Sequence, residues 1–411
     1  MRLKLITSLL TLAFAGAALA QTAPAAPAAP AAAPAAPAAA PPPEWKFELH
    51  GFVSGTLWIQ DALYNNNQGQ IALFGVQQYQ TDKLSFGGDV RQTRLNFSVA
   101  GPTVFGGAKP KGVVEIDFFG SEEFATTGAR ADVSIVPRMR VAYAELKSGG
   151  TTIQVGVQNM LTVGTIPQSL SHIAFPYTYG AGTVGWRQPG IWGWHMLGDS
   201  FELAWSLARA GWDTRGITSG FTYGVASGLP AVEARARFIL GKNFDMWLTG
   251  HWQTADRNGA GVVKNENTKT QIDTLVGVFG FKGNMGFLNL AGSAWYGKNA
   301  APLLGNILQW PNAPGATATD VFGYGAWAQA VFSLTKQLSL GFTYGLDHPD
   351  YEDAKQAGFL NFRNQNFVTM LRIAEGGFAY GLEYLYTRTT TSGPQDVVKA
   401  QQLSFTANYS F

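Results

Sequence analysis

The feature that most constrains the fold of this chain is an alternation of apolar and polar residues that runs from Trp45 to Phe411. In residues 403–411, every odd position holds Leu, Phe, Ala or Tyr, and every even position holds Ser, Thr or Asn. Successive side chains of a β-strand point to opposite faces, so a period of two predicts strands with one apolar face. About sixteen such segments occur, and lengths near ten residues suit tilted strands that cross a bilayer. They lie at residues 46–58, 90–100, 111–119, 136–146, 151–159, 183–196, 200–209, 230–240, 244–254, 272–282, 286–296, 321–333, 338–346, 364–374, 378–388 and 400–411.

The connections between these segments alternate between short turns and long polar loops. The short turns are rich in Gly, Asn, Lys and Asp, although the turn at 101–110 is long for its class. Short periplasmic turns and long external loops are typical of outer-membrane barrels, whereas a β-sandwich has no reason to sort its loops. The sequence therefore predicts an all-β fold, a transmembrane up-and-down antiparallel β-barrel of about 16 strands. The number of strands depends on whether residues 183–196 and 217–226 form strands. The long loops lie near residues 59–89, 120–135, 160–182, 210–229, 255–271, 297–320, 347–363 and 389–399.

Composition and the end of the chain agree with a membrane barrel. Charged residues make up 14% of the chain, against about 25% in soluble domains. In lipid, strands satisfy their backbone N–H and C=O groups only as a closed barrel, and an even strand number returns the C-terminus to the periplasm. The terminal Phe411 resembles the recognition signal of outer-membrane barrels. We also expect an aromatic girdle at the membrane surface from tryptophans near strand ends. These are Trp186, Trp192, Trp194, Trp247, Trp252 and Trp295.

The first residues of the chain predict export. Arg2 and Lys4 precede an apolar run over 5–17, and residues 18–20 form an A-x-A cleavage site, so 1–20 is predicted to be a signal peptide. Residues 21–44 are almost entirely Ala and Pro, which predicts a disordered periplasmic linker before a barrel domain at 45–411. Cleavage removes two of the 29 basic residues and leaves 27 against 27 acidic ones, which argues against nucleic-acid binding.

The sequence lacks the residues that several classes of protein chemistry require. The chain has no cysteine, which excludes disulfide scaffolds, thiol enzymes and iron–sulfur proteins. The five histidines are scattered without metal-ligand spacing, and the G-x-G-x-x-G match at 180–185 opens no helix. We therefore expect no enzyme activity, no cofactor and no metal. A barrel enzyme or an adhesin is the alternative, which hydrolysis, or binding of host ligands by loops without conductance, would favour.

The inside of such a barrel carries the function, because sixteen strands leave an aqueous channel. The bulky apolar side chains face lipid, so the phase of each strand gives its inward residues. Within 136–146, this phase puts Ala142 inside and Val141 and Tyr143 outside. The predicted pore-lining residues are Arg94, Glu115, Asp117, Arg138, Arg140, Arg187, Arg235, Arg237 and Arg372.

Arginine dominates this inward set. Because arginine stays charged and offers a flat fork to carboxylates and phosphates, a pore that it lines attracts anions. Glu115 and Asp117 lie on a strand between arginines, and cross-strand pairing would neutralise part of the wall. Arg235 and Arg237 have fewer inward acids beside them, so we expect them to form an open basic ladder.

The long loop at 160–182 is more apolar and aromatic than a solvated loop needs to be. We expect it to fold inward and narrow the channel. The alternative is that it packs against another external loop or a neighbouring subunit.

Four segments resemble the DcaP-like outer-membrane porins over residues 90–160. They are RQTRLNF at 91–97, KGVVEIDFFG at 111–120, PRMRVAY at 137–143 and QVGVQ at 154–158. The resemblance implies a trimeric sixteen-stranded channel associated with dicarboxylates and other small organic anions. It also implies pore-wall arginines near a constriction, with acidic residues beside them, at Arg94, Arg138, Arg140, Glu115 and Asp117. Members of that family often have a helical coiled coil before the barrel, where this chain has Ala and Pro.

These observations predict a porin in the outer membrane of a Gram-negative bacterium. Small hydrophilic solutes would cross it by passive diffusion, with a preference for organic anions such as dicarboxylates. Its partners would be these small anions, outer-membrane lipid and further copies of the chain in a homotrimer. A non-selective or sugar-type porin is the alternative if every arginine is paired.

Overall fold

The computed structural model describes residues 44–65, 69–78, 83–120, 135–211, 223–256, 271–309, 319–393 and 396–411. The predicted signal peptide and all but the last residue of the predicted linker lie outside this part of the chain, so both stay predictions. No helix in the described ranges is long and apolar enough to cross a membrane.

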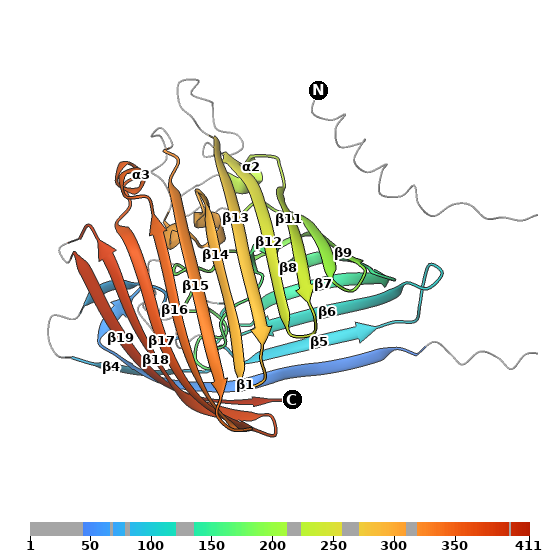
Figure 1. Ribbon diagram of the computed structural model, residues 1–411, viewed down its shortest axis with the longest axis horizontal. Helices are drawn as coiled ribbons and strands as arrows, with labels where there is room; N and C mark the ends of the chain where they lie inside the picture. Colours follow the sequence, from blue (N-terminus) through green and yellow to red (C-terminus); the bar gives the residue numbers. More distant parts are fainter. Residues whose placement is uncertain are drawn as a thin grey trace, which may run out of the picture. The chain divides into compact units, whose positions relative to one another are not determined.

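The described strands form a closed antiparallel barrel (Figure 1). β1 (Lys46–Gln60) pairs on one edge with β19 (Val397–Ser410) and on the other with β4 (Ser85–Asp89) and β5 (Arg94–Ala100). Because β4 and β5 take successive halves of β1, the seventeen described strands of the sheet make sixteen spanning strands, as predicted. The others pair in chain order: β6 (Lys109–Asp117), β7 (Arg138–Ser148), β8 (Thr151–Asn159), β9 (Arg187–Leu197), β10 (Phe201–Ala208), β11 (Ala231–Leu240), β12 (Phe244–Asp256), β13 (Gln271–Asn284), β14 (Leu288–Lys298), β15 (Phe322–Ser333), β16 (Leu338–Pro349), β17 (Asn361–Glu375) and β18 (Phe378–Thr391).

Every predicted segment overlaps one of these spanning strands, and short turns alternate with long connections as expected. The ambiguous segment 183–196 supplies β9, whereas the described end of 217–226 forms the short helix α2 (Tyr223–Ala226). The connections also hold β2 (Ala62–Tyr64), β3 (Gly75–Gln78), η1 (Leu161–Val163), η2 (Ala301–Leu303), η3 (Asn306–Leu308) and α3 (Tyr351–Gln356).

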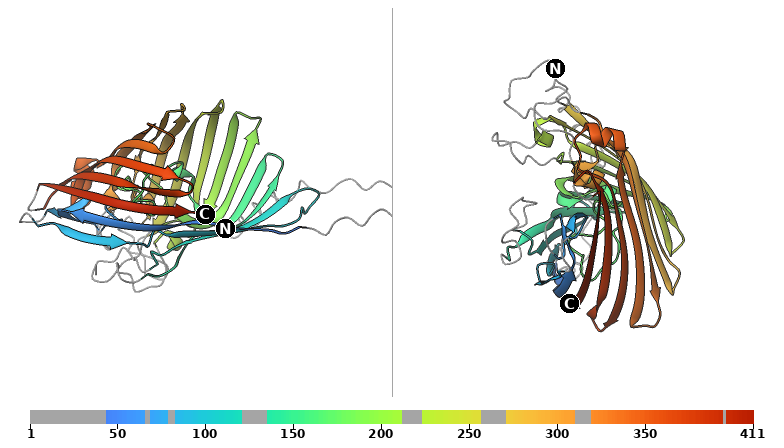
Figure 2. Two further views of the ribbon diagram at one scale, coloured as in Figure 1. Left: turned by 90° about the horizontal axis from the view of Figure 1, so that it is seen from below. Right: turned by 90° about the vertical axis from the view of Figure 1, so that its left-hand side faces the viewer.

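The last residue closes the barrel. The backbone N–H of Phe411 donates to the carbonyl oxygen of Gly51, and the N–H of Gly51 donates to that of Phe411, each over 3.1 Å. Figure 2 shows the C-terminus beside β1. No edge is left between the first and last strands, so their backbone groups are paired in the way that lipid requires.

Most of the tryptophans predicted to form an aromatic girdle lie inside the barrel. Trp192, Trp247 and Trp295 face inward and are buried, with Trp192 packed against Trp194 and the loop residue Leu161. The rings lie flat on neighbouring strands where glycine leaves room: a Cβ at Gly280 would come within 2.4 Å of the ring of Trp247. Trp186 also belongs to an interior cluster. The prediction was therefore wrong for these five residues, because position along a strand does not say which face a side chain takes.

A β-bulge in β7 changes which of its residues face inward, so the predicted phase of that strand was wrong after Arg140. Glu115 pairs with Val141 and Ile116 pairs with Met139, so Arg140 is an extra residue with no partner on β6. An extra residue reverses the alternation. Val141 and Tyr143 consequently line an interior cavity, whereas Ala142 shares the outward face with the exposed Val114.

The outward face predicts a test of membrane insertion. Leu248 is exposed near the middle of β12, where a charged side chain would lie in the bilayer core. We expect Leu248→Arg to lower the stability of the folded barrel by about 2–4 kcal/mol. Urea titration of the barrel refolded in lipid vesicles measures the change. Leu248→Phe, the apolar control, should unfold near the wild-type concentration, and equal stability of both variants would contradict an outward Leu248.

Candidate functional site: a constricted channel

The loop at 160–182 crosses the inside of the barrel, as predicted. At its start, the backbone N–H of Leu161 donates to the carboxylate of Glu233 on β11 over 2.6 Å. Further along, the N–H of Gln168 donates to the side-chain oxygen of Gln329 on β15 over 2.8 Å. These partners are inward residues of strands far from β8, where the loop begins, so the loop lies in the lumen and narrows it.

Glu383 on β18 is the central anchor of this loop. Its carboxylate accepts hydrogen bonds from the hydroxyl groups of Ser169 (2.8 Å) and Ser171 and from the backbone N–H of Leu170 (3.3 Å). Its Oε1 lies 2.7 Å from Nδ1 of His172, and both side chains are 1% exposed. A carboxylate is tolerated at such depth only when its oxygens are paired and hydrogen-bonded. Here the loop supplies those partners, so the carboxylate holds the loop on β18.

A second buried pair holds the start of the loop. Nδ1 of His251 on β12 lies 3.3 Å from Oε1 of Glu233, and the hydroxyl of Ser206 donates to Oε2 over 2.9 Å. Glu233 also accepts from Leu161 and Thr162. The loop is thus attached at two points by the same arrangement, a buried glutamate that faces a histidine and accepts loop donors.

The Ser171, His172 and Glu383 cluster does not have the geometry of a hydrolase. A catalytic triad places the serine on one ring nitrogen of histidine and the acid on the other. Here Ser171 Oγ (2.8 Å) and Glu383 Oε1 (2.7 Å) both approach Nδ1. Within the described residues, Nε2 of His172 has no hydrogen-bond partner. The same part of the chain contains no group of three or more Asp, Glu or His placed to hold a metal ion.

Two further long connections also enter the barrel. Leu73 is buried in the loop that carries β2 and β3, and its carbonyl oxygen accepts from the side-chain amides of Asn364 (2.9 Å) and Asn366 (3.0 Å) on β17. Leu303 of η2 and Ile307 of η3 are buried as well. Treating 59–89 and 297–320 as external loops was therefore wrong for these described parts; the apolar run at 71–73 was the available signal.

The arginines of β5 and β7 form one charged network with the acids of β6. Nε of Arg140 lies 2.8 Å from Glu115, and its Nη1 lies 2.7 Å from Asp117. Arg138 contacts Asp117 at 2.6 Å, and Arg94 lies 3.4 Å from Glu115. Arg138 and Arg140 lie two residues apart and so share the inward face, and the bulge brings Val141 to that face as well. The predicted cross-strand pairing is present and reduces the positive charge of this wall.

Arg187 differs from these arginines. Its guanidinium lies over the ring of Trp186, 4.2 Å from the centroid, and no carboxylate of the described residues lies within ion-pair distance. Tyr179 of the loop lies nearby; burial raises the pKa of its hydroxyl and the charge of Arg187 opposes the rise. That hydroxyl therefore stays neutral and leaves the charge of Arg187 uncompensated.

These groups surround an interior cavity of about 480 Å³ between the wall and the loop. Three arginines and one carboxylate of the described residues line it, so its wall carries excess positive charge. Gln158 and Asn159, neutral polar side chains that the phase analysis had not selected, also line it, together with apolar loop residues. Its lining includes Arg94, Asn96, Glu115, Arg140, Gln158, Asn159, Arg187, Val163, Ile166, Ile173 and Pro176.

The expectation of an open basic ladder at Arg235 and Arg237 was wrong. Glu202 on β10 lies 3.0 Å from Arg235 and 3.5 Å from Arg237, and Asp245 on β12 lies 2.6 Å from Arg237. Both acids come from neighbouring strands whose register had to be known. Lys282 on β13 also approaches Asp245, at 3.4 Å.

Arg372 lies on β17 and takes part in none of the ion pairs described above. It continues the inward series of Val368 and Met370 towards the short turn after Glu375. It is not among the residues that line the cavity.

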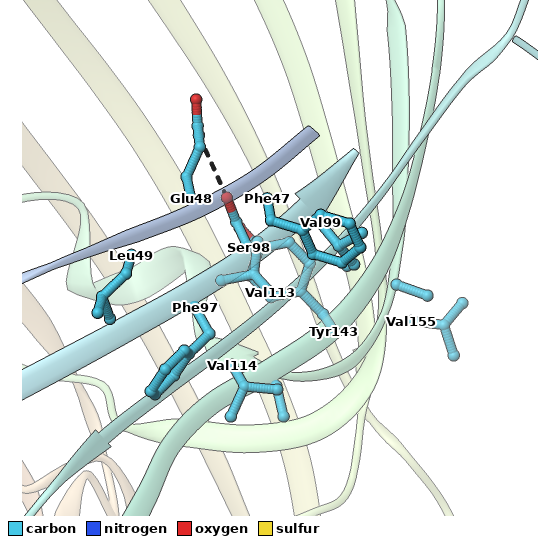
Figure 3. Close-up of a pocket in the computed structure, with 13 residues that line it drawn as sticks. Phe47, Glu48, Leu49, Phe97, Ser98, Val99, Val113, Val114, Tyr143 and Val155 are labelled. Atoms are coloured by element: carbon cyan, nitrogen blue, oxygen red, sulfur yellow. Dashed lines mark hydrogen bonds between the residues drawn. The ribbon is translucent and has the colours of Figure 1, made fainter. Parts of the chain in front are cut away.

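A larger hollow of about 730 Å³ lies on the outside of the barrel (Figure 3). Exposed apolar side chains of β1, β5, β6 and β8 line it: Phe47, Phe97, Val114 and Val155. Behind them, the hydroxyl of Ser98 donates to Glu48 over 3.3 Å. No arginine lines this hollow, so it belongs to the apolar outer surface and not to the channel.

Comparison with known proteins shows which solved structures share the fold of this barrel. No protein-family model matches the sequence. No curated protein matches it. Among solved structures, the outer membrane channel DcaP of Acinetobacter baumannii is similar with a TM-score of 0.70 and 18% identity, over 89% of this chain and 97% of that chain. OmpT, an outer membrane protein of Vibrio cholerae, gives 0.54 and 11% over 89% and 98% of the two chains. OprB of Pseudomonas putida gives 0.52 and 11% over 89% and 94%.

The chain therefore has the fold of an outer-membrane porin, the kind of barrel that Gram-negative outer membranes contain. The resemblance to DcaP-like porins, first seen over residues 90–160, extends in fold to the whole barrel.

The loop anchor predicts a change in conductance. Glu383→Ala removes the acceptor for the loop serines and leaves His172 buried without its partner, a loss of about 3–5 kcal/mol for such pairs. We expect the loop to leave β18 and the single-channel conductance in potassium chloride to rise and fluctuate. Glu375→Ala, an exposed carboxylate at the end of β17, is the control and should conduct like wild type. Wild-type conductance in Glu383→Ala would show that this contact does not hold the constriction.

Proposed function

We propose that this protein is a porin through which small hydrophilic solutes, above all organic anions, diffuse passively across the outer membrane. Dicarboxylates belong to that class. The observation that carries the proposal is the cavity beside the loop, lined by three arginines and one carboxylate of the described chain. The fold supports it, because the similar structures include proteins described as a channel and a porin.

Electrostatics give the reason for anion preference. Glu115 and Asp117 compensate part of the charge of Arg94, Arg138 and Arg140, but Arg187 has no such partner among the described residues. In a water-filled constriction, one unit charge at about 7 Å contributes about 0.6 kcal/mol, a factor of about three in local anion concentration. Arginine also offers two parallel hydrogen bonds to a carboxylate, so the wall can bind an organic anion as well as attract it.

A general, unselective porin is the second candidate. The ion pairs of Arg235 and Arg237 with Glu202 and Asp245 favour it, because they remove charge from the wall formed by β10, β11 and β12. The two candidates differ in the sign and size of the reversal potential.

The test measures the reversal potential of the purified protein in a planar bilayer under a potassium chloride gradient. We expect an anion-selective value for wild type and, for Arg187→Gln, a chloride-to-potassium permeability ratio about ninefold lower, since loss of one charge lowers the local anion concentration and raises the local cation concentration about threefold each. Arg388→Gln is the control, because Arg388 is an exposed arginine near the end of β18 outside the cavity. A cation-selective or unselective wild type would support the general porin instead.

We also propose that the barrel assembles as a homotrimer. A trimer form of OmpT of Vibrio cholerae has a similar fold, with a TM-score of 0.52, and the resemblance to DcaP-like porins implies the same state. Native mass spectrometry of the detergent-solubilised protein should give three times the mass of the mature chain. A single-chain mass across detergents would contradict the trimer.

A further inference from the structure

The outward face of β17, β18 and β19 changes in character towards the long connections. Along β18, the exposed Leu382 and Tyr384 are followed on the same face by Tyr386 and then by the exposed Arg388. The ring centroid of Tyr386 lies 6.1 Å from that of Phe367 on β17. Aromatic side chains gather where the apolar part of a bilayer meets its polar surface. Arg388, one outward position beyond them, therefore lies at the level of the lipid headgroups, on the side of the long loops.

Three basic side chains share the outward face at this level. β17, β18 and β19 lie side by side in the barrel wall (Figure 1). Arg388 is directly opposite Lys399 of β19, and Arg363 of β17 is opposite Thr390, the next outward residue of β18. Side chains directly opposite on neighbouring strands are about 5 Å apart at Cβ, and diagonal neighbours are about 7–8 Å apart. One phosphorylated molecule can therefore contact all three cations.

These three cations have no partner within the part of the chain that the structure describes. None of their side chains forms an ion pair or a hydrogen bond with a described residue. Nε of the half-buried Arg363 is itself buried, and no described acceptor reaches it. Like charges directly opposite each other on a sheet are destabilising, as Arg388 and Lys399 are here. An anion bound between them would remove that repulsion.

Acidic residues flank this group without neutralising it. Asp61, beside β19, accepts hydrogen bonds from the backbone N–H (2.7 Å) and the side-chain amide (2.9 Å) of Gln401. Asp396, just before β19, is exposed and lies beyond ion-pair distance of Lys399. The acidic residues of α3 and its N-cap also lie beyond ion-pair distance of the three cations. The outward face itself holds no acid between Phe367 and the long connections on β17, β18 and β19.

We propose that Arg363, Arg388 and Lys399 bind the phosphate groups of a phosphorylated lipid in the outer leaflet of the membrane. Arginine offers its flat fork to phosphate, and a cation at a membrane surface attracts anionic headgroups. The acyl chains would lie along the exposed Leu382 and Leu403, which continue the same face towards the middle of the bilayer. That apolar continuation favours a lipid over free phosphate. The inference goes beyond the proposed channel and does not depend on it, because these side chains face away from the lumen.

Native mass spectrometry of the protein in a neutral detergent tests this inference. The probe is lipid A, an acylated disaccharide with two phosphate groups, and its control is the same molecule after both phosphates have been removed. Wild type should retain lipid A and lose the dephosphorylated control. Equal retention of the two molecules, or retention of neither, would overturn the inference.

Variants test the assignment of the residues. Arg388→Gln and Lys399→Gln should each weaken the binding of lipid A about fivefold, the usual contribution of one cation at an anionic membrane surface. Lys399→Arg keeps the charge and should bind like wild type. Lys336→Gln is the matched control, because Lys336 is an exposed lysine on the short turn after β15, at the opposite end of the barrel. Wild-type binding in both glutamine variants of the cluster would overturn the assignment.

Further readouts exclude other roles for the cluster. Without lipid A, both glutamine variants should unfold at the wild-type urea concentration or above, because each removes one of two facing like charges. Unfolding at lower urea would show that these side chains have partners within the folded protein, against the proposal. Displacement of lipid A by an equimolar amount of inorganic phosphate, or loss of an oligomer mass in the variants, would overturn the lipid as occupant. Binding of lipid A by a wild type without anion selectivity would overturn only the proposed function.

Discussion

The structure depends on the pairing of backbone groups around a closed ring of strands. In hydrocarbon, an unpaired N–H or C=O costs several kcal/mol, so the first and last strands must meet. Gly51 and Phe411 make that closure by exchanging two backbone hydrogen bonds. Closure then divides every strand into an outward face, which lipid requires to be apolar, and an inward face, which is free to carry charge. All of the chemistry of this protein follows from that division.

The inward face holds the constriction through a few buried charges. Glu383 and Glu233 each face a histidine and accept hydrogen bonds from the loop at 160–182. A buried carboxylate that lost these partners would be strongly destabilising, so each anchor favours one position of the loop. The loop in turn places Ile166 among the residues that line the cavity with the arginines of the wall. These two buried glutamates therefore determine the width and the lining of the channel.

The net charge of the wall depends on its acidic residues as well as on its arginines. Asp117 and Glu115 hold Arg138 and Arg140 in place while cancelling part of their field. This fixes the direction of the guanidinium groups, which a free ladder of arginines would not do. Arg187, stacked on Trp186, adds a charge that has no carboxylate partner among the described residues. The anion preference that we propose thus depends on the excess of arginines over acids at this wall.

The sequence by itself determined the barrel, its strand segments and the alternation of turns and loops, because a period of two is a local signal that lipid outside and water inside impose on every strand. It also indicated Arg94, Arg138 and Arg140 as inward residues. Only the tertiary structure decided that a bulge at Arg140 reverses the phase of β7, that Trp247 and its neighbours face inward, and that Arg235 and Arg237 are paired. The pair of His172 and Glu383 joins residues 211 positions apart. Such contacts depend on register and closure, which no local pattern encodes.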